Sequence, residues 1–228
     1  MSLEEHLVDA GRDAEQLLDA LETPGLDEHQ RVAGIRAARL HDLGKAHPVF
    51  QTTLENSAKG EHIPIPGPWA KSPTQRGPGH SRPHFRHELV SALALLSQAS
   101  PLLDGFAERD LICYLTAAHH GKVRLAIRAM PDEQLPDDAE HPAGARIALG
   151  VIDGDVVPAV TIDGQTVGPL TLSLDAMDAG STETGKSWTS LTSGLVIRDD
   201  LGPFRLGFLE AIVRIADWLA SDTTEVRS

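Results

Sequence analysis

The chain has 228 residues, of which 41% are hydrophobic and 23% are charged. That composition is typical of a globular protein and excludes a disordered one, and the length suits one domain with an insertion or two small domains. The net charge of −13, with histidine counted as neutral, argues against a broad surface for binding polyanions. A phosphate-bearing substrate would therefore need a local source of positive charge, such as bound divalent cations.

The single cysteine, Cys113, excludes an intramolecular disulfide and fits a reducing compartment, so we expect a cytoplasmic protein. The longest apolar runs, such as LICYLTAA, fall short of the ~20 residues that a membrane span needs, and no membrane partner is expected. No basic segment followed by an apolar run opens the chain, which predicts that it has no signal peptide.

Five helices are predicted in the first half of the chain, at about residues 3–21, 27–43, 48–54, 86–97 and 107–120. Ser2 and Glu5 have the spacing of a capping box, and leucine and alanine then recur at helical intervals. Gly44 is expected to end the second helix and Gly121 the fifth, because glycine is the usual residue just beyond a helix.

A long loop is predicted at residues 56–85, where proline, glycine, serine and lysine crowd together in HIPIPGPWAKSPTQRGPGHSRPHF. Loops of this length are often functional. This one carries four positive charges, on Lys59, Lys71, Arg76 and Arg82.

The period changes at residues 146–174, where short β-branched runs alternate with Asp153-Gly154 and Asp163-Gly164, a hairpin signal. We predict two or three short strands there, followed by helices at about 188–197 and 203–221. No repeat or clear break divides the sequence. It predicts a mainly α fold in one domain over residues 1–228, with a small β-hairpin insertion near 146–174.

Residues 180–187, GSTETGKS, match the pattern of a phosphate-binding loop. Such a loop needs a strand that leads directly into it and a helix after it. Here residues 175–179 separate it from the last apolar run, and the residues that follow Ser187 make a poor helix start. We predict a linker at this position and no bound nucleotide.

Seven imidazole or carboxylate side chains lie on predicted helices, near a helix end or on an apolar face. They are His6, His41, Asp42, His87, His119, His120 and Asp217. Each has a simpler explanation when taken alone, such as a hydrogen-bonded core histidine, a favourable position at a helix C-terminus or an ion pair within one helix. Burying such groups from five different helices would cost much free energy unless they shared a cation. Imidazole and carboxylate without cysteine suit Mn, Fe, Co, Ni or Zn.

The other histidines fall in predicted loops or on polar faces, and we expect most of them to lie at the surface. They are His29, His47, His62, His80, His84 and His141. His80 and His84 flank Arg82 in the long loop, so lining a substrate path is an alternative for these two.

Several short motifs carry a family resemblance: HDLGK at 41–45, RHE at 86–88, AAHHG at 117–121, ADWLAS at 216–221, and an early histidine in a capped helix. Together they resemble the HD superfamily of metal-dependent phosphohydrolases. More closely, the chain is similar to the HD nuclease domain of the CRISPR-associated helicase-nuclease of type I interference systems. The resemblance extends from His6 to Asp217 and implies an HD-domain helical bundle around a metal pair.

The resemblance implies two divalent transition-metal ions, Mn, Fe, Co or Ni, with Mg or Zn as further options. One ion would be bound by His6, His41, Asp42 and Asp217. The other would be bound by Asp42, His87, His119 and His120, so that Asp42 bridges. The catalytic residues would be Asp42 and Lys45, with Lys45 meeting a phosphate oxygen or the developing charge. The alternative for Lys45 is a solvated lysine at a helix end.

The implied activity is metal-dependent hydrolysis of single-stranded DNA in CRISPR interference, as an endonuclease and then as an exonuclease from an end. The implied partners are a helicase domain or subunit and the CRISPR effector complex. Because the chain is so acidic, an HD phosphohydrolase for nucleotides or another small phosphorylated substrate is the main alternative. A metal-stabilised scaffold without catalysis is a third.

Overall fold

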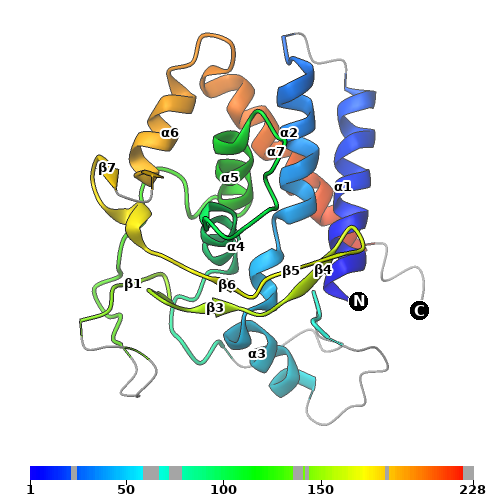
Figure 1. Cartoon of the computed structure of the whole chain (residues 1–228). Helices are drawn as coiled ribbons and strands as arrows, with labels where there is room; N and C mark the ends of the chain where they lie inside the picture. Colours follow the sequence, from blue (N-terminus) through cyan, green and yellow to red (C-terminus); the bar gives the residue numbers. More distant parts are fainter. Residues whose placement is uncertain are drawn as a thin grey trace.

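The computed structural model has helices packed around a buried core, with a long two-stranded ribbon across one side (Figure 1). It describes residues 1–21, 25–58, 67–71, 79–135, 141, 144–182 and 185–222. The helices are α1 (Leu3–Ala20), α2 (Glu28–Leu40), α3 (Pro48–Ala58), α4 (His87–Leu96), α5 (Arg109–Ala118), α6 (Trp188–Val196) and α7 (Gly202–Asp222), with 3-10 helices η1 (Leu43–Ala46) and η2 (Asp175–Met177). The prediction of a mainly α fold is confirmed. In the part of the chain described, no helix is both long and apolar enough to cross a membrane.

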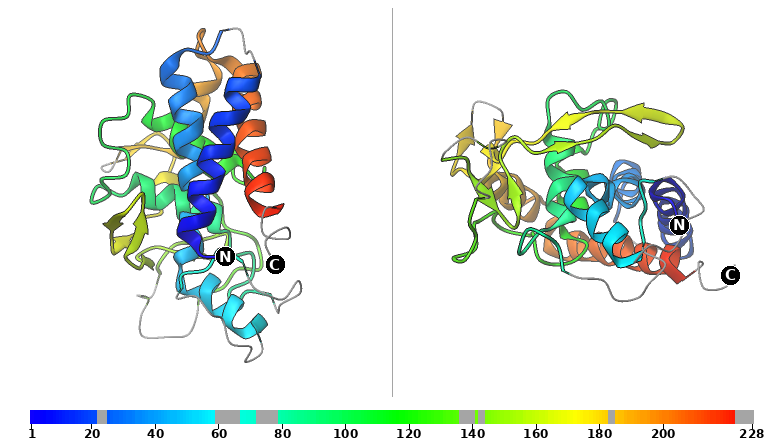
Figure 2. Two further views of the ribbon diagram at one scale, coloured as in Figure 1. Left: turned by 90° about the vertical axis from the view of Figure 1, so that its right-hand side faces the viewer. Right: turned by 90° about the horizontal axis from the view of Figure 1, so that it is seen from below.

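Helices α1, α2 and α7 lie side by side, so the first and last helices of the chain are neighbours (Figure 2). The predicted capping box opens α1, with Ser2 Oγ accepting from the Glu5 amide. Leu7, Ala14 and Leu18 follow at helical spacing and are buried in the shared core. Seen from below, the ribbon lies along the side of the bundle opposite α7 (Figure 2).

The end of α2 differs from the prediction. The helix stops at Leu40 rather than Leu43, and the chain then turns through His41 and Asp42 into η1. Gly44 does not end a helix. A Cβ there would lie 2.1 Å from the carbonyl oxygen of His87 and 2.8 Å from the amide nitrogen of Ser91. Glycine is needed because η1 lies directly against the backbone of α4.

The predicted fifth helix is shorter at both ends, because α5 spans only Arg109–Ala118. His119 is the residue that caps it, and Gly121 follows with a left-handed φ of 71°. Gly121 does not end the helix directly, as predicted, but lies three residues beyond its last residue, where a positive φ favours glycine.

The insertion holds more strands than the two or three predicted. They are β1 (Ile147–Ala148), β2 (Val151–Ile152), β3 (Val156–Val157), β4 (Val160–Ile162), β5 (Gln165–Val167) and β6 (Leu170–Thr171). β3 pairs with β6 and β4 with β5 in one continuous register, which makes a single long hairpin. Pro158 and Pro169 interrupt its ladder because proline has no N–H to donate.

Only one of the two predicted turns joins paired strands. Asp163-Gly164 lies at the tip of the long hairpin, as predicted. Asp153-Gly154 instead connects β2 to β3, which do not pair, and the turn between β1 and β2 falls at Leu149-Gly150. The tip is fixed to the bundle, because Asp163 Oδ2 accepts from Arg36 of α2 at 2.9 Å.

Residues 180–187, which match the phosphate-loop pattern, do not have the structure of such a loop in their described part. The described residues form two short strands, β7 (Ser181–Thr182) and β8 (Gly185–Lys186), which pair with each other. The Lys186 ammonium donates to Asp110 at 2.8 Å. A hairpin of this kind does not give the strand-to-helix turn that cradles a phosphate.

Candidate metal centre

All seven predicted site residues come together at the centre of the bundle. His6 lies in the first turns of α1, His41 and Asp42 in the turn after α2, and His87 at the start of α4. His119 and His120 follow α5, and Asp217 lies on α7. Their ligand atoms form two groups that share Asp42, and within each group these atoms all lie within 4.8 Å of one another.

The first group is made of two imidazoles that face two carboxylates. His6 Nε2 lies 3.0 Å from Asp42 Oδ2 and 3.3 Å from Asp217 Oδ1. His41 Nε2 lies 3.2 Å from Asp42 Oδ2 and 3.4 Å from Asp217 Oδ1. These four atoms are close enough together to share a single cation.

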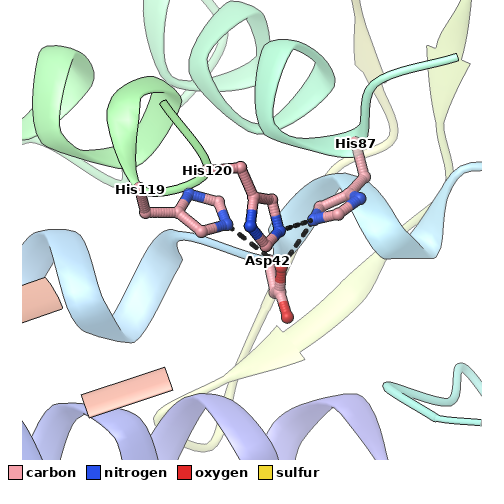
Figure 3. A group of neighbouring side chains, drawn as sticks. All are labelled: Asp42, His87, His119 and His120. Carbon is pink, nitrogen blue, oxygen red and sulfur yellow. Dashed lines mark hydrogen bonds and ion pairs between the residues drawn. The ribbon is translucent and has the colours of Figure 1, made fainter. Parts of the chain in front are cut away.

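The second group faces the other oxygen of Asp42 (Figure 3). Asp42 Oδ1 lies 2.9 Å from His87 Nε2 and 3.7 Å from His119 Nε2. His120 Nε2 lies 3.2 Å from His87 Nε2. Nitrogen ligands about 2.1 Å from one metal ion are separated by roughly 3.0–3.4 Å, so this spacing suits a shared ion. Asp42 thus directs one oxygen to each group.

Backbone carbonyls orient two of the rings. His41 Nδ1 lies 2.7 Å from the carbonyl oxygen of Ala38, and His119 Nδ1 lies 2.7 Å from that of Thr116. Both histidines directly follow a helix, where the last carbonyls have no partner within the helix. A ring that donates its Nδ1–H to such a carbonyl presents a bare Nε2 to the centre, which is the form that binds a metal.

Three of the inward-facing atoms are left without a hydrogen bond. Within the described part of the chain, His41 Nε2, Asp42 Oδ1 and His119 Nε2 are buried and make no well-oriented hydrogen bond. Buried polar groups are normally satisfied, and an exception calls for a physical reason. Cations between these atoms would satisfy all three, so the residues present fit a metal centre.

The electrostatics of the first group favour a positive charge. Burial raises the pKa of Asp217, but the adjacent rings of His41 and His6 outweigh it and hold this pKa far below its usual range. Burial lowers the pKa of His41, yet Asp42 and Asp217 reverse this and raise it to about 10. Without a metal, a proton on His41 thus offsets the carboxylates, and a cation would compete with that proton.

In the second group, burial keeps the rings neutral. Burial lowers the pKa of His119 well below its usual value, and the charge of His41 adds to this effect. Burial likewise lowers the pKa of His87 and outweighs the attraction of Asp42. Neutral imidazole is the form that binds a metal ion.

Two lysines stand beside the carboxylates. Lys45 makes a close ion pair with Asp42 Oδ2 from one turn further along the chain. Lys71, in the long loop, donates to the carbonyl oxygen of Ser221 at 3.0 Å. Burial lowers the pKa of Lys71, and the charge of Lys45 adds to this effect. The sequence marks Lys71 only as one of four loop cations.

The remaining histidines are not uniformly at the surface. His29 is exposed, but His47 is buried, so the surface expectation for His47 was wrong. His80, His84 and His141 are partly buried. His62 lies outside the described residues, as do Lys59 and Arg76 of the long loop.

His47 is buried because it packs against a carboxylate of the insertion. Asp155 accepts from Arg82 at 2.6 Å and from the Ile152 amide at 2.9 Å, and it lies 3.5 Å from His47 and 3.3 Å from His141. Burial raises the pKa of Asp155, but His47, Arg82 and this amide hold it far below its usual range. The cluster ties the long loop and the insertion to the segment that follows η1.

A cavity of about 390 Å³ lies between α5 and α7 and reaches His119. Arg124 and Arg214 line it, together with Tyr114 and Glu210. Glu210 accepts from the Tyr114 hydroxyl at 2.6 Å and pairs with Arg124 at 2.7 Å. The cavity therefore has two arginines in its lining beside His119, whose side chain is fully buried.

Comparison with known proteins gives one result. The family model described as "Cas3, HD domain" matches residues 1–226. Neither the curated proteins nor the solved structures contain a significant match to this sequence.

Proposed function

This chain belongs to the Cas3 HD domain family, which implies a metal-dependent nuclease of CRISPR interference, and we propose that it hydrolyses single-stranded DNA at a centre of two divalent cations. The observation that carries the proposal is the position of Asp42. Its Oδ2 lies 3.0 Å from His6 Nε2 in one group, and its Oδ1 lies 2.9 Å from His87 Nε2 in the other. A carboxylate that serves two adjacent groups of ligands is suited to bridge two ions.

We assign His6, His41, Asp42 and Asp217 to one ion, and Asp42, His87, His119 and His120 to the other. When bound, paired divalent cations stabilise the charge on attacking and leaving oxygens and lower the pKa of a bound water. The ligand set suits Mn, Fe, Co or Ni, and Mg or Zn are further options. Asp42 is the ligand whose loss would disturb both ions.

Lys45 and Lys71 supply the local positive charge that a chain of net charge −13 needs at a phosphate-binding site. We assign Lys45 to a non-bridging phosphate oxygen, because it is already held at the bridging carboxylate. Lys71 would bind the adjacent phosphate of a strand. Arg124 and Arg214 would guide that strand through the cavity beside His119.

The net charge of −13 also favours a second candidate, an HD phosphohydrolase for nucleotides or another small phosphorylated substrate. Such an enzyme needs only a pocket with metals, and no path for a strand. The proposed partners of the nuclease are a helicase domain or subunit and the CRISPR effector complex, which would deliver unwound DNA. A scaffold that binds metal without catalysis remains the third candidate.

Circular single-stranded DNA separates these candidates. With Mn²⁺, the nuclease cuts the circle, while an enzyme with a small pocket releases phosphate or nucleoside only from nucleotides. A protein that binds metal but does neither is a scaffold. Asp42→Ala should abolish cleavage and metal binding and leave most of the helical content, as measured by circular dichroism. Full activity in this variant would contradict the bridging role.

A further inference from the structure

Glu88 is a buried carboxylate that the centre described above does not use. It follows His87 in the first turn of α4 and is 1% exposed. Within the described part of the chain, neither of its carboxylate oxygens has a hydrogen bond. A carboxylate buried without partners is costly, so this residue needs a reason of its own.

Glu88 lies beside His87, on the side of that ring that faces away from Asp42. Glu88 Oε2 lies 3.8 Å from His87 Nδ1, the ring nitrogen that points away from Asp42. In His41 and His119, the N–H at the corresponding nitrogen donates to a carbonyl oxygen three residues earlier in the preceding helix. His87 is the first residue of α4, so no carbonyl of its own helix precedes it. The carboxylate of Glu88 lies beside His87 Nδ1, 3.8 Å away and so just beyond hydrogen-bond distance.

Charge gives a second and independent reason. The first group of ligands contains two carboxylates, Asp42 and Asp217, whereas the second contains Asp42 alone with three imidazoles. Glu88 lies close enough to His120 for its negative charge to act on that ring. It therefore adds negative charge to the second group from outside the set of ligands.

We infer that Glu88 is a positioning residue for the second ion. Its carboxylate accepts the Nδ1–H of His87, which requires an approach of about 1 Å to reach hydrogen-bond distance. This contact fixes the tautomer in which His87 Nε2 is bare and makes the ring a stronger ligand. The inference rests on the proposed metal centre.

The test is cobalt binding by the whole chain, measured by calorimetry and by the visible absorption of bound Co²⁺. Glu88→Gln keeps the shape and removes the charge. We expect it to weaken one of two binding steps by about 10–100-fold, the usual range for such outer partners, and to change the Co²⁺ spectrum. The metal-free variant should melt no lower than the wild type, because an unpaired buried charge has been removed.

Two further variants give controls. Glu88→Asp keeps the charge on a shorter side chain and should recover more cobalt affinity than Glu88→Gln. Asp13→Asn changes another buried carboxylate with an unsatisfied oxygen, seven residues beyond His6 on α1, and should leave both binding steps unchanged.

The outcomes separate the two proposals. Wild-type protein that binds no cobalt would overturn the metal centre itself. Wild-type binding combined with an unchanged affinity and spectrum in Glu88→Gln would overturn only the role of Glu88. A loss of stability in metal-free Glu88→Gln, with cobalt affinity retained, would show that Glu88 has a purely structural role.

Discussion

Gly44→Ala tests the contact that brings Asp42 to His87. A methyl group at this position would lie 2.1 Å from the carbonyl oxygen of His87 and 2.8 Å from Cβ of Val90. Relief requires η1 and α4 to separate by about 1 Å, and both sides of the contact are backbone. Overpacking of this kind costs about 3 kcal/mol. In a chain of this length, that lowers the melting temperature by roughly 6–12 °C.

The same separation should weaken metal binding, because the 2.9 Å distance between Asp42 Oδ1 and His87 Nε2 spans this contact. The assay is thermal unfolding together with cobalt titration. Gly194→Ala is the matched control. Gly194 lies inside α6 with nothing within 4 Å of an added Cβ, so the variant should gain about 0.5–1 kcal/mol from helix propensity. A Gly44→Ala protein with wild-type melting and cobalt affinity would refute the close packing of η1 on α4.

The other predictions concern the charges around the centre. Asp155→Asn should cost about 3 kcal/mol at neutral pH, since it leaves Arg82 and His47 without their carboxylate. Folding lowers the pKa of Asp155, so its contribution to the free energy of unfolding is full above about pH 5 and is lost as the pH falls below about 4. Denaturation of the wild type and of Asp155→Asn across this range should show their free energies of unfolding converging at low pH. A difference that stays constant would contradict the ion pairs. Lys71→Ala should raise the KM for single-stranded DNA more than it lowers kcat, and the reverse result would place Lys71 at the reacting phosphate. Divalent cation at 100 times its Kd should stabilise the fold by about 2.7 kcal/mol, and a chelator should reverse this in a melting experiment; no shift would argue against metal binding by the folded state.

Local signals predicted most of the helices. The capping box at Ser2 and Glu5 and the helical spacing of Leu7 and Leu18 depend only on neighbours along the chain, and the structure has them as expected. The predicted end of α2 was wrong because glycine is required at position 44 by a contact with α4, more than forty residues further on, and not by the end of its own helix.

Long-range pairing accounts for the other differences. The polar sequence around His47 suggests a surface position, and only the fold brings Asp155 against it. The strands β3 and β6 pair across 13 residues or more, so the sequence shows the central turn but not how far the ribbon extends. Neither the contact between His47 and Asp155 nor the pairing of β3 with β6 can be recognised in a short window of sequence.

The clustering of the candidate site residues was easier to predict than the structure around them. Histidine and aspartate at helix ends stand out, and the structure brings all seven predicted residues together. Glu88 was missed because an acidic residue in the first turn of a helix is common and already favourable there. Lys71 was missed because the loop that carries it has no periodicity that fixes its direction.

The position of Asp217 has a consequence for the cell that makes this protein. During synthesis α7 leaves the ribosome after every other helix described here, and it is the element that brings the last carboxylate between His6 and His41. A nascent or truncated chain that stops before α7 thus lacks a residue that we assign to the first ion, together with the helix on which α1 and α2 pack. The first group of ligands is therefore complete only once α7 has packed against α1.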